Sequence, residues 1–204
     1  GHLVVALGLR DEDRLGELSL PPTIQGVIQA RLDRLPPDAR EALARAAVIG
    51  KTFWESALER LRSTAIGPLS EVSTSEILAQ LRSRRLLHER EASGLPGERE
   101  YVFAESALQE VAYESLTLKT RRLLHLAAAE WLGARAPGST ISAQLALHYD
   151  RGGDPGRAAL AYARAASHAT GLGGHDEALR HLTRARELHD ASRGEEVEGS
   201  TSER

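Results

Sequence analysis

The chain has 204 residues, of which 41% are hydrophobic, so it holds enough apolar material for the cores of one or two domains. Its 26 basic and 29 acidic residues leave a net charge of −3, which gives no global electrostatic basis for binding nucleic acid or membranes. The absence of cysteine excludes disulfides, thiolate metal sites and cysteine catalysis. No run of about 18 apolar residues and no signal peptide occurs, so we expect a soluble, cytoplasmic protein. Methionine is absent even at position 1, which indicates a fragment of a longer chain.

The N-terminal part of the chain is predicted to form short helices separated by prolines. Residues 1–20 are interpreted as the end of an upstream domain or a linker, and Pro21-Pro22 marks a boundary. Thr23 is a good N-cap for a helix that ends at Pro36-Pro37, and this second proline pair starts a helix over residues 38–49. The apolar face of the first helix consists of Ile24, Val27, Ile28, Leu32 and Leu35.

The tripeptide Gly50-Lys51-Thr52 matches the end of a phosphate-binding P-loop. That motif needs another glycine where this chain has Arg45, and it must follow a strand. Residues 38–49 have the apolar spacing of a helix instead. We therefore interpret Gly50 as the end of that helix, and Thr52 with Glu55 as the capping box of a helix over about residues 53–62.

A second capping box, Ser73-x-x-Glu76, predicts a helix that runs to about Arg85. Two β-rich runs, residues 86–91 and 99–103, flank a segment rich in glycine and proline and predict a β-hairpin. Helices followed by a hairpin are typical of a winged-helix domain, which we expect over residues 21–116.

Arginines at the end of that helix raise the question of DNA binding. Arg82, Arg84 and Arg85 would lie on the recognition helix, with Arg90 and Arg99 on the hairpin. Acidic residues outnumber these arginines between residues 71 and 105, and they would repel phosphates. DNA binding is therefore the weaker hypothesis for these arginines. The alternatives are a solvated helix end, an interdomain contact or an internal salt-bridge surface.

The C-terminal part is predicted to be helical, with breaks near residues 137–138, 152–155 and 171–174. A tetratricopeptide (TPR) template of about 34 residues fits residues 159–192. It predicts that small side chains let two antiparallel helices approach while Tyr162 and Leu182 fill the adjacent space. The matched packing positions are Tyr162, Ala166, Ala178, Leu182 and Ala185.

Other positions limit this repeat signal. Ala165, Ala169 and Asp190 depart from the template, and the preceding window fails because Gln144 and His148 occupy apolar positions. We expect a TPR-like helical region over residues 117–189. The polar residues 190–204 are expected to be a disordered tail.

No constellation for catalysis or metal binding is found in the sequence. His168, His175, His181 and His189 are grouped in the C-terminal third, but they lack the spacing and partners of a zinc site. Serine, cysteine and metal hydrolase motifs are also missing. We therefore predict a chain that is not an enzyme and has no catalytic, cofactor-binding or metal-binding residues.

Eight short runs of the chain occur in a recognisable order: residues 20–25, 30–36, 46–53, 101–103, 111–116, 121–125, 148–149 and 153–155. Together they resemble the region after the nucleotide-binding module of bacterial STAND-class signalling ATPases. Such regions occur in multidomain Ser/Thr kinases, adenylate/guanylate cyclases and LuxR-type regulators. The resemblance implies a winged helix followed by a TPR-like array, with ATP and magnesium bound only upstream of residue 1.

One position departs from that family. Its members usually have a histidine two residues after the phenylalanine that corresponds to Phe103, where this chain has Glu105. That histidine is a candidate relay between nucleotide state and the rest of the protein, so we expect no nucleotide-sensing role for Glu105.

The sequence thus predicts a mostly α protein with a winged-helix domain and TPR-like helical hairpins. Its expected function is regulatory: coupling an upstream ATP-binding switch to a helical array that binds a protein partner. Two alternatives stay open, a DNA-binding winged-helix regulator with a TPR oligomerisation arm and a plain TPR adaptor. No membrane contact is expected.

Overall fold

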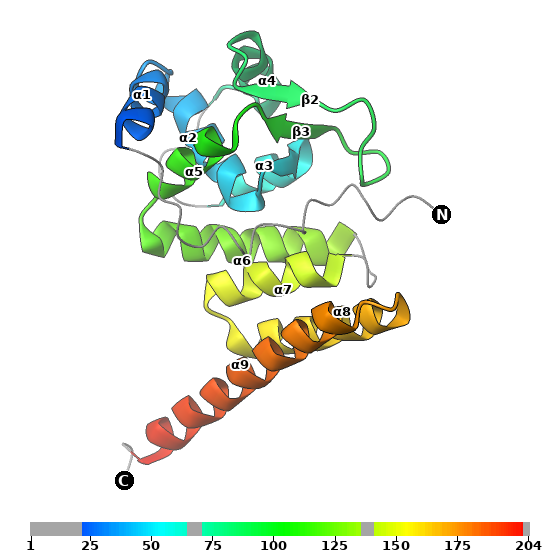
Figure 1. The fold of residues 1–204 in the computed structure, drawn as a ribbon. Helices are drawn as coiled ribbons and strands as arrows, with labels where there is room; N and C mark the ends of the chain where they lie inside the picture. The colour runs from blue at the N-terminus through cyan, green and yellow to red at the C-terminus, as the bar shows by residue number, and fades with distance from the viewer. Residues whose placement is uncertain (1–21, 65–70, 136–140, 202–204) are drawn as a thin grey trace. The chain divides into compact units, whose positions relative to one another are not determined.

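A computed structural model describes residues 22–64, 71–135 and 141–201 of the chain (Figure 1). The chain forms two compact units, residues 1–116 and 117–204. In chain order, the first unit contains α1 (Pro22–Asp33), α2 (Pro37–Ile49), β1 (Thr52–Trp54), α3 (Glu55–Arg62), α4 (Thr74–Ser83), β2 (Leu87–Glu89), β3 (Glu100–Phe103) and α5 (Ser106–Glu114). The second contains α6 (Leu118–Arg135), α7 (Ser142–Gly152), α8 (Pro155–Gly171) and α9 (His175–Thr201). The prediction of a mostly α protein is confirmed. The segment interpreted as the end of an upstream domain or a linker, residues 1–20, lies outside the described residues.

A small antiparallel sheet organises the first unit, with β3 between β1 and β2. Leu87 of β2 pairs with Phe103 of β3, which confirms the predicted hairpin. β1 was missed by the sequence prediction, because a strand this short gives no periodicity and its partner is distant in sequence. Thr52 pairs with Val102 in the sheet, and no side chain caps α3, so the predicted Thr52–Glu55 capping box is wrong.

Aromatic side chains from two strands form the core of this unit. The ring of Phe53 on β1 lies 5.8 Å from that of Tyr101 and 5.7 Å from that of Phe103, both on β3. All three are fully buried. Aromatic pairs of this kind add to the stability that area burial gives, so β1 is held by its side chains as well as by its backbone hydrogen bonds.

Arg45 occupies the position where a P-loop would need glycine, and it has a structural role. Its guanidinium is buried between α2 and the end of α3, where it donates hydrogen bonds to the carbonyl oxygens of Leu61 and Thr64. It also pairs with Glu41, one turn earlier on α2. The Leu61 carbonyl also accepts the backbone N–H of Thr64, so the Arg45 side chain adds a charge-assisted hydrogen bond that joins α2 to the end of α3.

The second predicted capping box is confirmed. The backbone N–H of Glu76 donates to Ser73 Oγ at 3.2 Å, and the backbone N–H of Ser73 donates to the Glu76 carboxylate at 3.0 Å. These hydrogen bonds from Ser73 lower the pKa of Glu76. Both contacts lie within four residues of sequence, which explains why the pattern alone revealed the start of α4.

A buried carboxylate closes the loop between β2 and β3. Glu100 is only 2% exposed, and its carboxylate accepts hydrogen bonds from the Arg90 guanidinium at 2.6 Å and from Ser93 Oγ at 3.3 Å. It also accepts the backbone N–H of Gly94. A charge that is removed from water needs such partners, so the loop conformation and Glu100 stabilise one another.

The second unit is a succession of helices in which α6 packs on α7, α7 on α8 and α8 on α9. Successive helices run in opposite directions (Figure 1). Small side chains dominate the contacts of α8, which lets the helix axes approach closely. A cluster from three helices consists of Ala146, Ala158, Ala161, Tyr162, Ala185 and Leu188, and a second cluster consists of Ala166, Ala169 and Ala178.

Two glycines end α7. A Cβ on Gly152 would lie 2.7 Å from Cδ2 of Leu126, so a larger residue there requires the Leu126 side chain of α6 to shift. Gly153 has φ 79°, the left-handed conformation that favours glycine after a helix. Asp154 then caps α8 by accepting the backbone N–H of Arg157 at 2.9 Å.

Two expectations for α9 differ from the structure. Leu182 is 51% exposed and does not fill the space between helices, because α9 turns Ala178, Ala185 and Leu188 towards α8. The helix also continues to Thr201 instead of ending in a disordered tail near residue 190. Extending a helix that is already nucleated costs little, so polar residues can continue it.

A first test addresses Glu100. We expect Glu100→Gln to lower the free energy of unfolding of the first unit by about 2 kcal/mol, because a neutral amide replaces a carboxylate that accepts charge-assisted hydrogen bonds. Each unit carries one buried tryptophan, Trp54 or Trp131. Urea unfolding followed by Trp54 fluorescence, in a Trp131→Phe background, measures the loss. Glu91→Gln, an exposed change in the same loop, is the control; equal unfolding midpoints for the two variants would contradict the role of Glu100.

Candidate functional site

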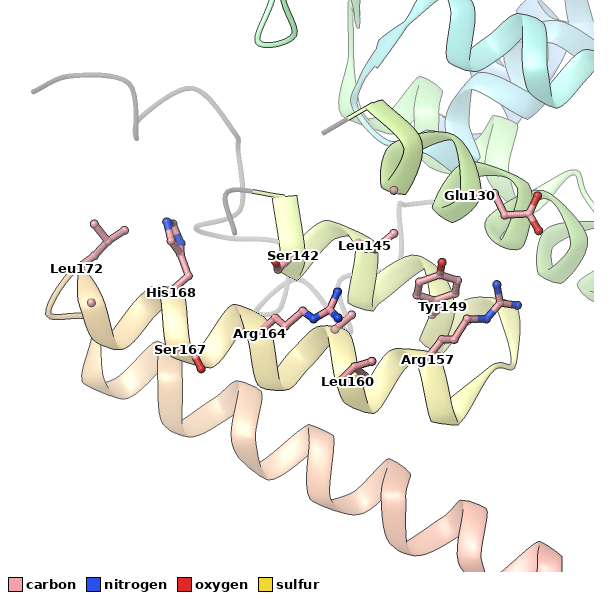
Figure 2. A pocket seen from close by; sticks show the side chains of 13 residues that line it. Glu130, Ser142, Leu145, Tyr149, Arg157, Leu160, Arg164, Ser167, His168 and Leu172 are labelled. Carbon is pink, nitrogen blue, oxygen red and sulfur yellow. The ribbon is translucent and has the colours of Figure 1, made fainter. Parts of the chain in front are cut away.

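The second unit carries a groove among its described residues. It has a volume of about 1140 Å³ and is lined by residues of α6, α7 and α8. Figure 2 shows α7 and α8 side by side with their labelled side chains along it. Its lining combines apolar side chains such as Leu145 and Leu160 with Arg157, Arg164, His168 and the acidic Glu130.

The apolar residues of α8 are distributed in an unusual way. The face of the helix that packs on α7 and α9 consists mostly of alanine, with Ala158, Ala165 and Ala166 buried. The larger Leu160 and Leu172 point into the groove and are 56% and 59% exposed. Burying a leucine stabilises a fold more than burying an alanine does. The exposed Leu160 and Leu172 therefore leave apolar surface in the groove, while the buried face of α8 is alanine.

The groove-lining residues of α8 form a ladder. Leu160, Arg164 and His168 on α8 and Leu172, which caps its C-terminal end, follow one another at intervals of four residues, so the three helical residues lie along one face and Leu172 continues it. The two ends of the ladder are apolar and its two middle positions are basic or titratable. This order gives the groove a defined chemical pattern along α8.

The two groove arginines differ in their partners. Arg157 pairs with the Asp154 carboxylate at 2.5 Å, and its guanidinium lies 4.6 Å from the centre of the Tyr149 ring. The hydrogen bond to Asp154 raises the pKa of Arg157. Arg164 makes no hydrogen bond or ion pair through its side chain with the residues that the structure describes. Arg164 is thus a cation that remains available to a ligand.

Two histidines form a buried pair between α6 and α7. The Nδ1 atoms of His125 and His148 are 2.9 Å apart, so one ring donates a hydrogen bond that the other accepts. Burial lowers the pKa of His125 to about 2, and His148, Arg151 and Arg121 act in the same direction. The pair explains why the repeat template failed over this hairpin: His148 occupies an apolar position, but its ring is buried against a second histidine.

The arginines considered for DNA binding lie in a surface of mixed charge. Arg82 pairs with Glu89 at 2.6 Å, and Glu89 also pairs with Arg99 at 3.1 Å. Hydrogen bonding to Arg99 lowers the pKa of Glu89. Arg84 and Arg85 are exposed at the end of α4, and Arg85 has φ 55°. The structure therefore neutralises one of the three arginines locally and leaves two in solvent.

The other residues singled out by the sequence are distributed as follows. Tyr162, Ala166, Ala178 and Ala185 are buried between the helices of the second unit. Of the four C-terminal histidines, His168 alone lines the groove. Among the residues that the structure describes, no three histidine, aspartate or glutamate side chains are grouped so that they could hold a metal ion.

Sequence reasoning missed the groove residues Tyr149, Leu160, Arg164 and Leu172. A signal for the last three was present in the sequence, because together with His168 they recur at intervals of four residues beside a face of alanines. The template assigned α8 by Tyr162 and its small residues and gave Leu160, Arg164 and Leu172 no role.

Comparison with protein-family models, with curated proteins and with solved structures found no match. In the described part of the chain, no helix is both long and apolar enough to cross a membrane.

The histidine pair predicts acid sensitivity of the second unit. Because folding lowers the pKa of His125 from 6.5 to about 2, the unfolded state binds the proton more readily between these values. Stability is therefore fully present above about pH 6.5 and falls by up to about 1.4 kcal/mol for each pH unit below it. Urea unfolding followed by Trp131 fluorescence, in a Trp54→Phe background, measures this slope.

The variants separate this pair from other histidines. We expect the double substitution His125→Leu and His148→Leu to flatten the pH dependence, whereas His175→Leu, at an exposed position on α9, should leave it unchanged. An unaltered slope in the double variant would show that the pair does not cause it.

Proposed function

We propose that this chain is a non-catalytic protein-interaction module whose second unit binds a polypeptide segment of a partner in the groove on α8. The observation that carries the proposal is the exposure of Leu160, Arg164 and Leu172 along one groove, while the same helix buries alanines. Both leucines are more than half exposed, so a polypeptide bound over them would remove apolar surface from water.

The length of the groove favours a polypeptide over a small molecule. Its lining on α8 extends from Arg157 to Leu172, which at about 1.5 Å per residue is roughly 22 Å. An extended chain of about seven residues covers that distance. Grooves formed by successive helical hairpins commonly bind partners on such surfaces.

We further propose that the first unit is a winged helix and that the chain acts within a larger STAND-type signalling ATPase. The order α2, β1, α3, α4, β2, β3 and the central place of β3 support a winged helix. The sequence resemblance supports the ATPase context, in which ATP and magnesium belong to another part of the protein. A plain TPR adaptor would use the same groove without a regulatory role for the first unit.

Glu105 has a local role that differs from nucleotide sensing. Its carboxylate pairs with Arg31 of α1 at 3.0 Å, at the residue that precedes α5. Both side chains are partly exposed, so the pair adds little stability. Within the proposed signalling protein, this contact would orient α1 against α5.

A selection experiment tests the proposed groove. We expect random peptides displayed on phage to yield sequences that bind the protein, and Leu160→Glu to weaken their binding by about tenfold or more, since it places a charge among apolar contacts. Fluorescence anisotropy with the selected peptides measures the affinity, and circular dichroism checks that the variant folds.

The matched control is Leu179→Glu on α9, where the native leucine is 65% exposed and lies outside the groove. It should bind within about twofold of the wild type, because it alters no groove contact. If no peptide is selected, or if both variants lose binding equally, the groove is not the interaction site.

The DNA-binding alternative is tested separately. We expect no salt-sensitive binding of duplex DNA, because Glu89 neutralises Arg82 and the hairpin carries further acids. Fluorescence anisotropy at low and moderate salt measures it. Binding that disappears in the variant with Arg82, Arg84 and Arg85 replaced by alanine would favour the transcription-regulator alternative instead.

A further inference from the structure

We propose that the segment bound in the groove is acidic at its centre and apolar at its ends, with two carboxylate side chains on alternate residues facing Arg164 and His168. This inference rests on the proposed function, since it specifies which polypeptides the groove selects. It commits to an extended segment of a partner protein.

The spacing of the ladder matches an extended chain. Leu160, Arg164, His168 and Leu172 are separated by four residues each, which corresponds to steps of about 6 Å along α8. Alternate side chains of an extended strand lie on one face at about 6.6 Å. We therefore expect an extended ligand to contact these four residues with every other side chain. Those side chains would be, in order, an apolar residue, two acids and a second apolar residue.

Charge favours acids at the two central positions. Arg164 has no side-chain partner among the described residues, so a carboxylate can pair with it without displacing an existing contact. His168 lies on the next turn and offers a second polar ring. A basic segment would instead meet like charge at Arg164. Pairing of a guanidinium with a carboxylate is among the stronger hydrogen bonds in proteins.

The ends of the ladder favour apolar side chains for a different reason. Leu160 and Leu172 are more than half exposed, so a large apolar residue over each would remove that surface from water. Arg157 does not extend the basic region beyond Leu160, because its guanidinium is already held by Asp154 and Tyr149. The structure thus limits the acidic preference to the middle of the groove.

The groove also offers a partner for the backbone of an extended ligand. The Ser167 hydroxyl donates to the carbonyl oxygen of Ala163 at 3.1 Å and retains lone pairs that can accept a ligand N–H. An extended segment needs such acceptors, since it does not satisfy its own backbone groups.

The test uses the full chain and fluorescein-labelled heptapeptides in anisotropy titrations at low salt. The acidic peptide is Leu-Ser-Glu-Ser-Glu-Ser-Leu. Its comparisons replace both glutamates by glutamine or by lysine, and a register control, Leu-Glu-Glu-Ser-Ser-Ser-Leu, keeps the composition but removes the alternation. We expect the acidic peptide to bind about tenfold more tightly than each of the others.

A charge reversal assigns the preference to one residue. Arg164→Glu should weaken the acidic peptide about tenfold and strengthen the lysine peptide, because the sign of the central rung changes. Arg180→Glu makes the same change in net charge at an exposed position of α9 outside the groove, and it should alter neither affinity by more than about twofold.

The outcomes separate this inference from the proposed function. Equal binding of the glutamate and glutamine peptides, or equal effects of Arg164→Glu and Arg180→Glu, would overturn the acidic preference. Peptides selected by phage display that bind in the groove without acids at alternate positions would also overturn the acidic preference. In that case the proposed function, polypeptide binding in the groove, would stand. If the selection itself yields no groove-dependent peptide, the proposed function fails as well.

Discussion

The close approach of helices at alanine side chains is the constraint on which the second unit depends. Ala146 on α7, Ala158 and Ala161 on α8, and Ala185 on α9 meet in one cluster, and larger residues there would separate the helices. Gly152 extends the same requirement to the contact between α6 and α7. With the interior of α8 occupied by small residues, its leucines lie on the surface, and the groove is a consequence of this packing.

Polar groups inside both units fix particular contacts. Arg45 bonds to the carbonyl oxygens of Leu61 in α3 and of Thr64 just after it. Glu100 holds the loop between β2 and β3, and the rings of His125 and His148 share one hydrogen bond. Each of these groups would be costly if it lost its partner, so each favours one arrangement of the elements around it. Arg184 acts in a similar way at the surface, since both of its hydrogen bonds to Asp150 join α9 to α7.

The features that the sequence predicted correctly are those whose physical cause is local. The Ser73–Glu76 capping box and the break after α7 each involve neighbouring residues, and both are found in the structure. β1 escaped prediction because Thr52 needs Val102 as its partner, far along the chain. Leu182 was assigned to the interior by a template, although its exposure depends on which face α9 turns towards α8. The groove needed the structure, because residues of three helices line it.

The alanine interior of the second unit also links its folding to what it binds. An interface of alanines buries less apolar surface per residue than one of leucines, so it leaves the folded unit with a smaller margin of stability. A ligand that binds only the folded state adds its own binding free energy to that margin. Occupancy of the groove would then determine how long the unit stays folded, and hence how readily proteases degrade it when no partner is present.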